Sequence, residues 1–303
     1  MTSVAVLIVT WNNERTITAC LDSLARQECA TPVRVYVWDN DSADDTASIV
    51  AGRADVTLVR ASQNEGFARG VNRLAARCDE PLLLLVNPDT ELDRGAISAL
   101  VATIETLGGE AIVGGRLESL EGEPQLAAAR PFPRSVGLCK WVVSRRAQTW
   151  ALPQQQAHVD AVSGAFMLVP RSLWDAVGGL DEGYPHAGED LELCLDAARR
   201  GVPVLYQPAA RAFHEREASV VQAPAEIDVL RWVGMVRFAA SYEGRAAAAL
   251  LRGVVMIYAL AVIVATALGV RRSARSLRRA RLLLRWAVLR EVPAHPAAPV
   301  GTA

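Results

Sequence analysis

Carboxylates stand at two positions where they could do chemistry: one follows a predicted strand, and two begin a predicted helix. Asp89 stands three residues beyond the apolar run 82–86, after a turn that contains a proline. Glu189 and Asp190 open a predicted helix directly after the glycine-rich segment 178–188. A carboxylate at a strand end can hold a divalent cation that binds a diphosphate, and an ionised carboxylate at a helix start can act as a general base. Both motifs are also ordinary turn and cap chemistry, so their meaning depends on the elements that position them.

Up to about residue 117 the chain alternates between strand and helix patterns with short connections. Short apolar runs rich in β-branched residues or leucine predict strands at 4–10, 33–39, 54–60, 82–86 and 111–117. The segments between them predict helices at 14–27, 42–53, 66–78 and 93–107. This alternation predicts a parallel sheet with helices on both faces, whose ligand lies beyond the carboxyl ends of the strands. Three polar clusters, 10–13, 39–45 and 87–89, fall at those ends.

The loop after the first predicted strand excludes two common ways of binding a nucleotide. It lacks the GxGxxG of dinucleotide-binding proteins, and the sequence contains no GxxxxGK[ST] of the P-loop type. It also lacks the glycine-rich, basic loop expected of a nucleotidyltransferase on a similar sheet. A sheet without these loops needs another means of holding a phosphate, and a metal ion is the usual one.

Composition and charge indicate a folded protein with an unusual C-terminal region. Apolar residues make up 51% of the 303 residues, and the five scattered cysteines include no CxxC, which argues against a zinc site or a disulfide framework. Residues 1–250 carry 23 basic and 32 acidic side chains, whereas residues 251–303 carry nine arginines and a single glutamate. The last fifth of the chain is therefore expected to contact something different from the rest.

The order of the motifs resembles that of a known family. The motifs are "TWNN" (10–13), "VWDNDSADDT" (37–46), "NEGFARGVN" (64–72), "LLVNPDTEL" (84–92), "VSGAFMLVPRSLWDAVGGLDE" (162–182), "GEDLELCLDAARRG" (188–201) and "ARAFH" (210–214). In this order they resemble glycosyltransferase family 2, and within it the rhamnosyltransferase-like branch that builds bacterial cell-surface polysaccharides. The resemblance covers about residues 3–216. It implies a GT-A fold, a nucleotide-sugar donor and inversion at the anomeric carbon.

The resemblance also implies a role for each matching residue. Asp190 would be the catalytic base. Asp89 would bind the metal, Mg²⁺ or Mn²⁺, with His214 as a second ligand or a diphosphate contact. The nucleotide would be bound by Thr10, Asn12, Asp39, Asn64, Gly66, Phe67, Asn72 and Asn87. The sugar and acceptor sites would be bordered by Ser163, Gly164, Ala165 and Glu189. One base and one metal suffice for a single displacement that releases a nucleoside diphosphate.

The sequence departs from the family pattern at two motifs. Asn87 replaces the first Asp of the DxD-type motif, which leaves one carboxylate fewer for the metal. The QxxRW motif of the processive polysaccharide synthases is absent, because "DVLRW" (228–232) and "LLLRW" (282–286) both lack the glutamine. We therefore expect the addition of a single sugar.

The C-terminal region has features of a membrane-associating segment. After a helix predicted near 224–242, residues 253–270 form an uncharged run of 18 residues, which as a helix would be just short of a hydrocarbon core of about 30 Å. Residues 271–290 carry eight arginines beside an apolar stripe, a pattern typical of a helix that lies on an anionic membrane surface. The predicted stripe is Leu277, Ala280, Leu284 and Val288. The alternative for 253–270 is a buried core helix.

The sequence thus predicts an α/β protein in three parts. Residues 1–223 form a GT-A catalytic domain with a Rossmann-like mixed, mostly parallel sheet flanked by helices. Its nucleotide-binding half is expected at about 1–117 and its acceptor half at about 118–223. A helical, membrane-associating region follows at 224–290, and residues 291–303 form a disordered tail.

The function expected from these features is the metal-dependent transfer of one sugar, rhamnose from dTDP-rhamnose, to a lipid-linked or polysaccharide acceptor in cell-surface glycan synthesis. Residues 246–290 would hold the enzyme on the membrane surface at the cytoplasmic face of the cell membrane, and no nucleic-acid partner is expected. Two alternatives stay open. One is a UDP-sugar-dependent transferase of the same fold, and the other is a catalytically idle, membrane-bound scaffold of a glycan assembly complex.

Overall fold

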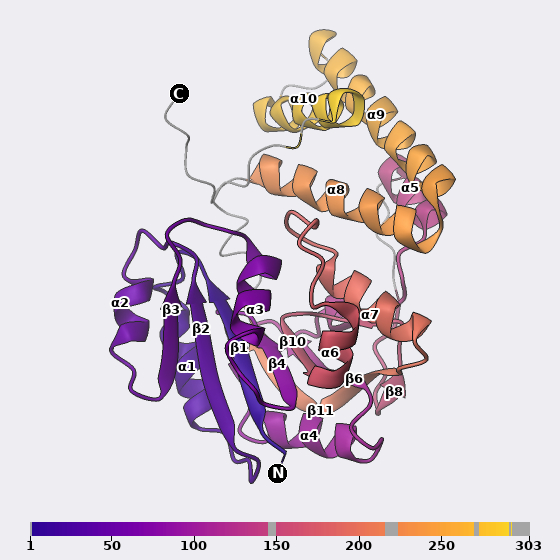
Figure 1. The fold of residues 1–303 in the computed structure, drawn as a ribbon. Coiled ribbons are helices and arrows are strands. Elements are labelled where there is room, and N and C mark those ends of the chain that lie inside the picture. Colours follow the sequence, from indigo (N-terminus) through magenta and orange to yellow (C-terminus); the bar gives the residue numbers. More distant parts are fainter. Residues whose placement is uncertain (1, 145–149, 216–223, 270–272, 291, 293–303) are drawn as a thin grey trace.

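The computed structural model describes residues 2–144, 150–215, 224–269, 273–290 and 292, which form a sheet flanked by helices and a further group of helices beyond one edge of it (Figure 1). The strands are β1 (Val4–Thr10), β2 (Val33–Asp39), β3 (Val56–Arg60), β4 (Leu82–Val86), β5 (Thr90–Leu92), β6 (Ile112–Glu118), β7 (Ala129–Arg130), β8 (Ala157–His158), β9 (Ala161–Val162), β10 (Phe166–Pro170) and β11 (Val204–His214). The helices are α1 (Ile17–Ala25), α2 (Thr46–Ala51), α3 (Phe67–Ala75), α4 (Ala96–Glu105), α5 (Ser135–Ser144), α6 (Arg171–Val177), α7 (Glu189–Arg199), α8 (Pro224–Tyr242), α9 (Arg245–Ala267) and α10 (Ala274–Leu289), with a 3-10 turn, η1 (Leu126–Ala128).

The main sheet confirms the predicted fold class. Its order is β3-β2-β1-β4-β10-β6-β11-β5, with β8 paired to β11. The strands β3, β2, β1 and β4 are parallel, as the strand–helix alternation predicts. Strand β10 lies antiparallel between β4 and β6, so the fifth predicted strand does not pair with the fourth. The sheet is therefore mixed and mostly parallel, and every residue of β1 and β4 is buried, as their unbroken apolar sequences require.

Helix α3 packs closely on the amino-terminal half of the sheet, in front of it in Figure 1. Its buried residues include Ala68, Val71 and Leu74, which lie on one face of the helix. A Cβ atom on Gly70 would lie 2.9 Å from side-chain atoms of Val9 and Trp38, so only glycine permits this approach. The close packing fixes the start of α3 beside the carboxyl ends of β1 and β2.

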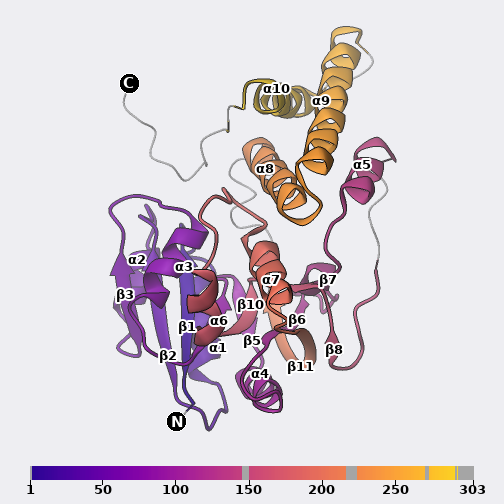
Figure 2. The same ribbon diagram turned by 45° about the vertical axis from the view of Figure 1, so that its right-hand side comes forward.

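Helices α8, α9 and α10 pack with α5 into a group of their own on the side of the sheet where the parallel strands end (Figures 1 and 2). A second apolar core lies inside this group and includes Val142 of α5, Trp232 of α8, Leu251 of α9 and Leu283 of α10. Helix α5 comes from a stretch without a clear sequence pattern, so the helical group is not made by the C-terminal region alone. Phe238 of α8 lies in the main core instead, so α8 belongs to both.

Helix α9 is the one described helix that is long and apolar enough to cross a membrane, and 28% of its most apolar stretch is buried within the protein. It begins eight residues before the uncharged run, at Arg245. One side of α9 packs in the helical group, whereas Leu250, Ile257 and Val264 are each more than half exposed. These three residues are spaced by seven, so they form a stripe along one side of the helix.

Helix α10 turns its apolar side toward the protein. Its buried residues are Ala280, Leu283, Trp286 and Ala287, which pack against α8 and α9. The predicted stripe was expected to face a membrane surface, but its member Ala280 is buried within the protein and the bulky Trp286 shares that buried face, whereas Val288 is 56% exposed. The first arginines of this segment, 271 and 272, and the predicted tail, apart from residue 292, lie outside the described residues.

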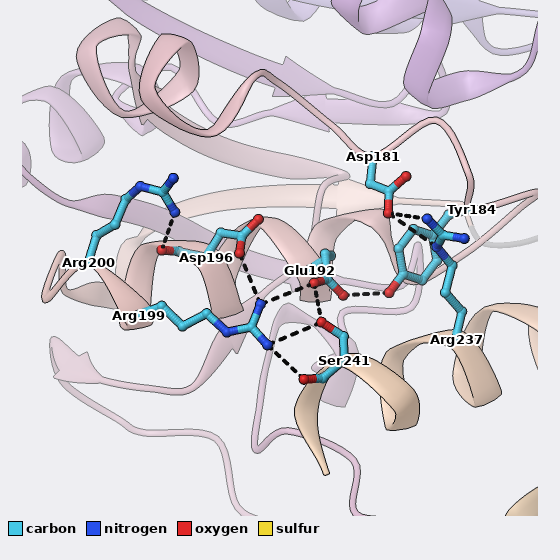
Figure 3. A network of polar contacts seen from close by, with 8 residues as sticks. All are labelled: Asp181, Tyr184, Glu192, Asp196, Arg199, Arg200, Arg237 and Ser241. Atoms are coloured by element: carbon cyan, nitrogen blue, oxygen red, sulfur yellow. Dashed lines mark hydrogen bonds and ion pairs between the residues drawn. The ribbon is translucent and has the colours of Figure 1, made fainter. Parts of the chain in front are cut away.

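A buried polar network joins α7 to α8 (Figure 3). The carboxylate of Glu192 accepts hydrogen bonds from the hydroxyl groups of Tyr184 (2.6 Å) and Ser241 (2.5 Å). Arg199 donates to the backbone carbonyl of Ser241 at 2.7 Å and lies 3.5 Å from Glu192. Burial and the adjacent Glu192 carboxylate raise the pKa of Tyr184, which keeps its hydroxyl protonated as a donor.

Backbone contact reinforces the same junction. A Cβ atom on Gly234 of α8 would lie 1.9 Å from the carbonyl oxygen of Ala187, in the loop that leads into α7. Arg237, one turn further along α8, pairs with Asp181 at 2.7 Å and lies over the ring of Tyr184. Helix α8 therefore supports the loop that precedes the two acidic residues at the start of α7.

Candidate functional site

The carboxyl ends of the parallel strands and the start of α7 enclose a cavity of about 270 Å³. The predicted site residues that line it are Thr10, Asn64, Gly66, Phe67, Asn87, Asp89, Ser163, Gly164, Ala165, Glu189 and Asp190. Four further lining residues, Trp11, Asn13, Asn40 and Pro88, belong to the clusters predicted at the strand ends, whereas Val9 and His186 were not predicted. Segments that are far apart in the sequence thus meet at the sheet edge where a ligand was expected.

The end of β2 supports one wall of this cavity. Asp39 is fully buried behind the lining, where it accepts hydrogen bonds from the Thr10 hydroxyl and the Ser42 amide, both at 3.2 Å. Asn40, the next residue, accepts from the amide of Glu65 (2.9 Å) and donates to the carbonyl of Gly66 (3.1 Å). The sequence places Asn40 beside Asp39, but its function as a brace for the loop before α3 depends on the fold.

The loop before α3 places the start of that helix at the cavity. Gly66 has a φ of +87°, which favours glycine, and its amide donates to the side chain of Asn64 at 2.9 Å. Phe67 begins the helix and lines the cavity beside Gly66. The exposed amides and the helix dipole at such a start favour a bound anion.

Three predicted nucleotide-binding residues do not line the cavity: Asp39, which is buried behind its wall, and Asn12 and Asn72. Asn12, which has a φ of +54°, accepts a hydrogen bond from the amide of Ala43 at 2.8 Å. Asn72 lies on α3 and bonds the backbone of Leu180 in both directions, with both distances 2.9 Å. In this structure both side chains hold loops in place, and the nucleotide contacts predicted for them stay predictions.

Asp89 and His214 meet at the edge of the cavity, where β5 pairs with the end of β11. The Nε2 atom of His214 lies 3.4 Å from the Asp89 carboxylate and 3.3 Å from the side-chain nitrogen of Asn87. The side-chain nitrogen of Gln125 donates to the backbone carbonyl of His214 at 2.6 Å. This contact places the side-chain oxygen of Gln125 2.9 Å from Nδ1 of the His214 ring. With the proton on Nδ1, the lone pair of Nε2 faces Asp89.

This pair fits a divalent cation in its chemistry. Carboxylate oxygen and imidazole nitrogen are both common ligands of Mn²⁺ and related ions, and Gln125 fixes the ring. No group of three or more His, Cys, Asp or Glu side chains placed to hold a metal ion is found within the described ranges. A cation held by Asp89 and His214 would therefore need its other ligands from water or the substrate, as is usual where a metal binds a diphosphate.

The start of α7 presents two adjacent carboxylates with different surroundings. Asp190 is fixed by an ion pair with Arg130 (2.8 Å) and by the amide of Leu191 (2.8 Å). Burial and the neighbouring Asp190 charge raise the pKa of Glu189 above that of an ordinary glutamate. Of the two, Asp190 is the carboxylate with a defined orientation.

Arg130 was missed by sequence reasoning. It lies on the two-residue strand β7, which pairs with β9 just before the predicted Ser163–Gly164–Ala165 segment. That segment closes the cavity, since the Ala165 carbonyl accepts from the amide of Asn87 at 3.1 Å. No periodicity or motif marks Arg130, so only the fold could reveal that it pairs with Asp190.

A mixed sheet of this order, with an acidic cavity at its carboxyl edge, is that of a GT-A glycosyltransferase. Residues 2–234 match the model of the "Glycosyltransferase like family 2". The chain therefore belongs to glycosyltransferase family 2, as the order of its motifs suggested, and is a transferase.

Similar proteins agree with this assignment. The chain is 28% identical over 221 residues to the N-acetylglucosaminyl-diphospho-decaprenol L-rhamnosyltransferase of Mycobacterium tuberculosis, covering 64% of this chain and 70% of that protein. Its fold is similar to that of S. aureus TarS 1–349 in complex with UDP-GlcNAc, with a TM-score of 0.55 at 13% identity over 96% of this chain and 93% of that one. It is also similar to the mannosyltransferase PcManGT from Pyrobaculum calidifontis in complex with GDP-Man and Mn²⁺, with a TM-score of 0.51 at 17% identity over 95% of this chain and 86% of that one.

Proposed function

We propose that this protein is an inverting, metal-dependent glycosyltransferase that moves one sugar from a nucleotide-sugar to a lipid-linked acceptor. The observation that carries the proposal is that Asp89 and Asp190 line the same cavity, one beside His214 and the other beside Arg130. A site for the leaving diphosphate and a base for the incoming hydroxyl are thus within reach of one substrate. The reaction is then a single displacement, which inverts the anomeric carbon.

The donor would be bound along β1, β2 and α3. Thr10 and, behind it, Asp39 would contact the base of the nucleotide, and the amides at the start of α3 suit a phosphate. Asp89 and His214 would hold Mg²⁺ or Mn²⁺, whose charge would stabilise the leaving diphosphate. Rhamnose from dTDP-rhamnose is the expected donor, supported by the rhamnosyltransferase to which the chain is similar. A UDP-sugar is the alternative, because thymine and uracil present the same N3–H group to Asp39.

The acceptor would be bound on the side of α7. Asp190 would take the proton of the attacking hydroxyl, and Arg130 would hold the carboxylate in the orientation that this transfer needs. Ser163, Gly164 and Ala165 form the cavity wall next to Asp190, so a sugar bound against them would lie beside the base. Glu189 would border the same sugar.

A lipid-linked acceptor is supported by the helical group. The exposed stripe of Leu250, Ile257 and Val264 on α9 gives the protein an apolar surface, and exposed arginines follow on α10. Such a combination suits the surface of an anionic membrane. We infer that the protein acts at the cytoplasmic face of the cell membrane through residues 246–290.

A donor screen tests the proposal directly. Purified protein is incubated with Mg²⁺ or Mn²⁺ and with dTDP-rhamnose, UDP-glucose, UDP-galactose, UDP-GlcNAc or GDP-mannose in the presence of a lipid extract as acceptor source, and the release of nucleoside diphosphate is measured. We expect one donor to be turned over, chelation by EDTA to stop the reaction, and Asp190→Asn to lower kcat at least 100-fold.

Asp196→Asn is the matched control, because Asp196 lies on the same helix and pairs with Arg199 away from the cavity. It should keep nearly full activity. Full activity in EDTA would contradict the metal dependence, and full activity of the Asp190→Asn variant would contradict the assignment of the base. Turnover of a UDP-sugar in preference to dTDP-rhamnose would select the alternative donor.

A further inference from the structure

A second cavity, of about 410 Å³, lies between the catalytic part and the helical group. Its walls come from the segment after β7, from α5, α7 and α8, and from α10. It is distinct from the cavity that holds Asp89, with which it shares no lining residue. Its volume lies in the range of sites for small molecules.

One part of this cavity is aromatic. It is lined by three tryptophans: Trp141 of α5, Trp232 of α8, and Trp150, which precedes β8. The ring centroids of Trp141 and Trp232 are 5.4 Å apart. Trp150 is fixed by a hydrogen bond from its indole nitrogen to the carbonyl of Ala129 at 2.8 Å. Three indole rings provide a large apolar surface suited to a hydrocarbon chain.

The other part is basic. Arg130, Arg231 and Arg279 line the cavity together with one carboxylate, Asp228, which lies 3.3 Å from Arg279 and 3.9 Å from Arg231. The buried Nε atoms of Arg130 and Arg279 have no hydrogen-bond partner within the described part of the chain. Buried donors without a partner are costly, and phosphate oxygens are the acceptors that guanidinium groups bind best.

The two cavities are joined through one ion pair. Arg130 lines the second cavity, while its ion-pair partner Asp190, at 2.8 Å, lines the cavity that holds Asp89. Leu191, the residue after Asp190, also lines the second cavity. A molecule whose anionic group is held by the arginines therefore lies directly behind the proposed base.

From these observations we infer that the second cavity binds the diphosphate and the first part of the hydrocarbon chain of a lipid diphosphate acceptor, with Arg130, Arg231 and Arg279 on the diphosphate and the tryptophans on the chain. The inference rests on the proposed transfer to a lipid-linked acceptor and names its chemical class. It assigns Arg130 a double function, because the residue contacts the acceptor and positions Asp190. The sugar of the acceptor would then extend past Arg130 toward the catalytic cavity.

Direct binding tests this inference without turnover. Farnesyl diphosphate serves as the probe, and quenching of tryptophan fluorescence is followed in EDTA, so that no metal draws the diphosphate to Asp89. We expect saturable binding of farnesyl diphosphate and at least tenfold weaker binding of farnesol, which lacks the diphosphate, and of inorganic diphosphate, which lacks the chain. Arg231→Gln and Arg279→Gln should each weaken farnesyl diphosphate binding about tenfold, the effect of one charge-assisted hydrogen bond.

Arg281→Gln is the control, because Arg281 lies on α10 but does not line the second cavity. It removes the same charge and should leave the dissociation constant unchanged. Equal affinity for farnesol would overturn the inference, as would equal losses in the Arg279→Gln and Arg281→Gln variants. Circular dichroism of each variant shows whether it is folded, and the Arg231→Gln variant carries the test if Arg279→Gln is not. Donor turnover without farnesyl diphosphate binding would reject this cavity while leaving the proposed function intact.

Discussion

The contact between Gly234 of α8 and the loop that leads into α7 predicts an unusual response to a Gly→Ala substitution. In a helix interior this change normally stabilises a protein by about 1 kcal/mol, because alanine has the higher helix propensity. At Gly234, however, the new Cβ atom would lie 1.9 Å from the carbonyl oxygen of Ala187. Real Cβ contacts are essentially never shorter than 3.0 Å, so the two backbones must move apart by about an ångström.

The cost of that movement exceeds the gain in propensity. Overpacking of this kind costs about 1–3 kcal/mol, and here it acts against backbone, which cannot rotate away. The displacement also strains the hydrogen bonds of Glu192 to Tyr184 and Ser241 across the same junction. We expect Gly234→Ala to lower the free energy of unfolding by about 1–2 kcal/mol, and the Tm by about 2–8 °C. Because Ala187 lies beside His186 and Glu189, kcat/KM should fall about 10- to 100-fold.

Gly253→Ala in α9 is the matched comparison. Gly253 is also inside a helix, but no atom lies within 4 Å of its added Cβ. This variant should be more stable than the wild type by about 0.5–1 kcal/mol. Thermal unfolding followed by circular dichroism measures both variants, and nucleoside diphosphate release measures the activity of Gly234→Ala. If both substitutions raised the Tm alike, the proposed tight docking of α8 on the α7 loop would be refuted.

Three further predictions concern other parts of the structure. Glu189 binds its proton more tightly in the folded protein than in the unfolded chain, so stability should fall as pH rises from about 4.5 through its raised pKa, and Glu189→Gln should flatten this fall in a series of thermal unfolding curves. Glu192→Ala leaves the buried hydroxyl of Tyr184 and the half-buried hydroxyl of Ser241 without an acceptor and should cost about 1–3 kcal/mol in urea unfolding; a loss below about 0.5 kcal/mol would contradict the importance of the network. Ile257→Asp introduces a charge into the exposed stripe of α9 and should reduce co-sedimentation with anionic vesicles, whereas unchanged sedimentation would show that this stripe is not the membrane contact.

The strands and the acidic positions could be predicted because they depend on local pattern. An unbroken run such as 82–86 has to be buried, and a parallel sheet brings the residues after each strand to one edge. Asp89 therefore lies at that edge, whereas only the family resemblance implied that the acids at the start of α7 belong to the same site. The division of the chain at residue 223 stays a prediction, as do the roles assigned to individual side chains.

The parts that escaped prediction depend on tertiary contacts. Arg130 lies on a strand of two residues, too short for any periodicity, and its partner Asp190 is sixty residues away. Helix α5 is recognisable only by its packing on α9. The buried face of α10 differs from the predicted stripe because Trp286 inserts toward α9, and the side chain of Asn72 is directed by the loop at Leu180 rather than by its own helix.

The position of helix α8 limits where the chain can be shortened to give a folded fragment. Its Phe238 lies in the core of the catalytic part, where it contacts Phe132, whereas its Trp232 lies in the core of the helical group. A fragment that stopped at residue 223 would expose Phe132 and would lose the contacts of α8 with the loop before α7. The two parts therefore do not behave as independent domains joined by a linker. A fragment that ended after Tyr242 would keep Phe238 in place, but the loss of α9 and α10 would expose Trp232, so neither cut leaves both cores intact. Helix α8 thus forms part of both cores and also contacts the loop that leads into α7, so a change in the packing of α9 would be felt beside the cavity.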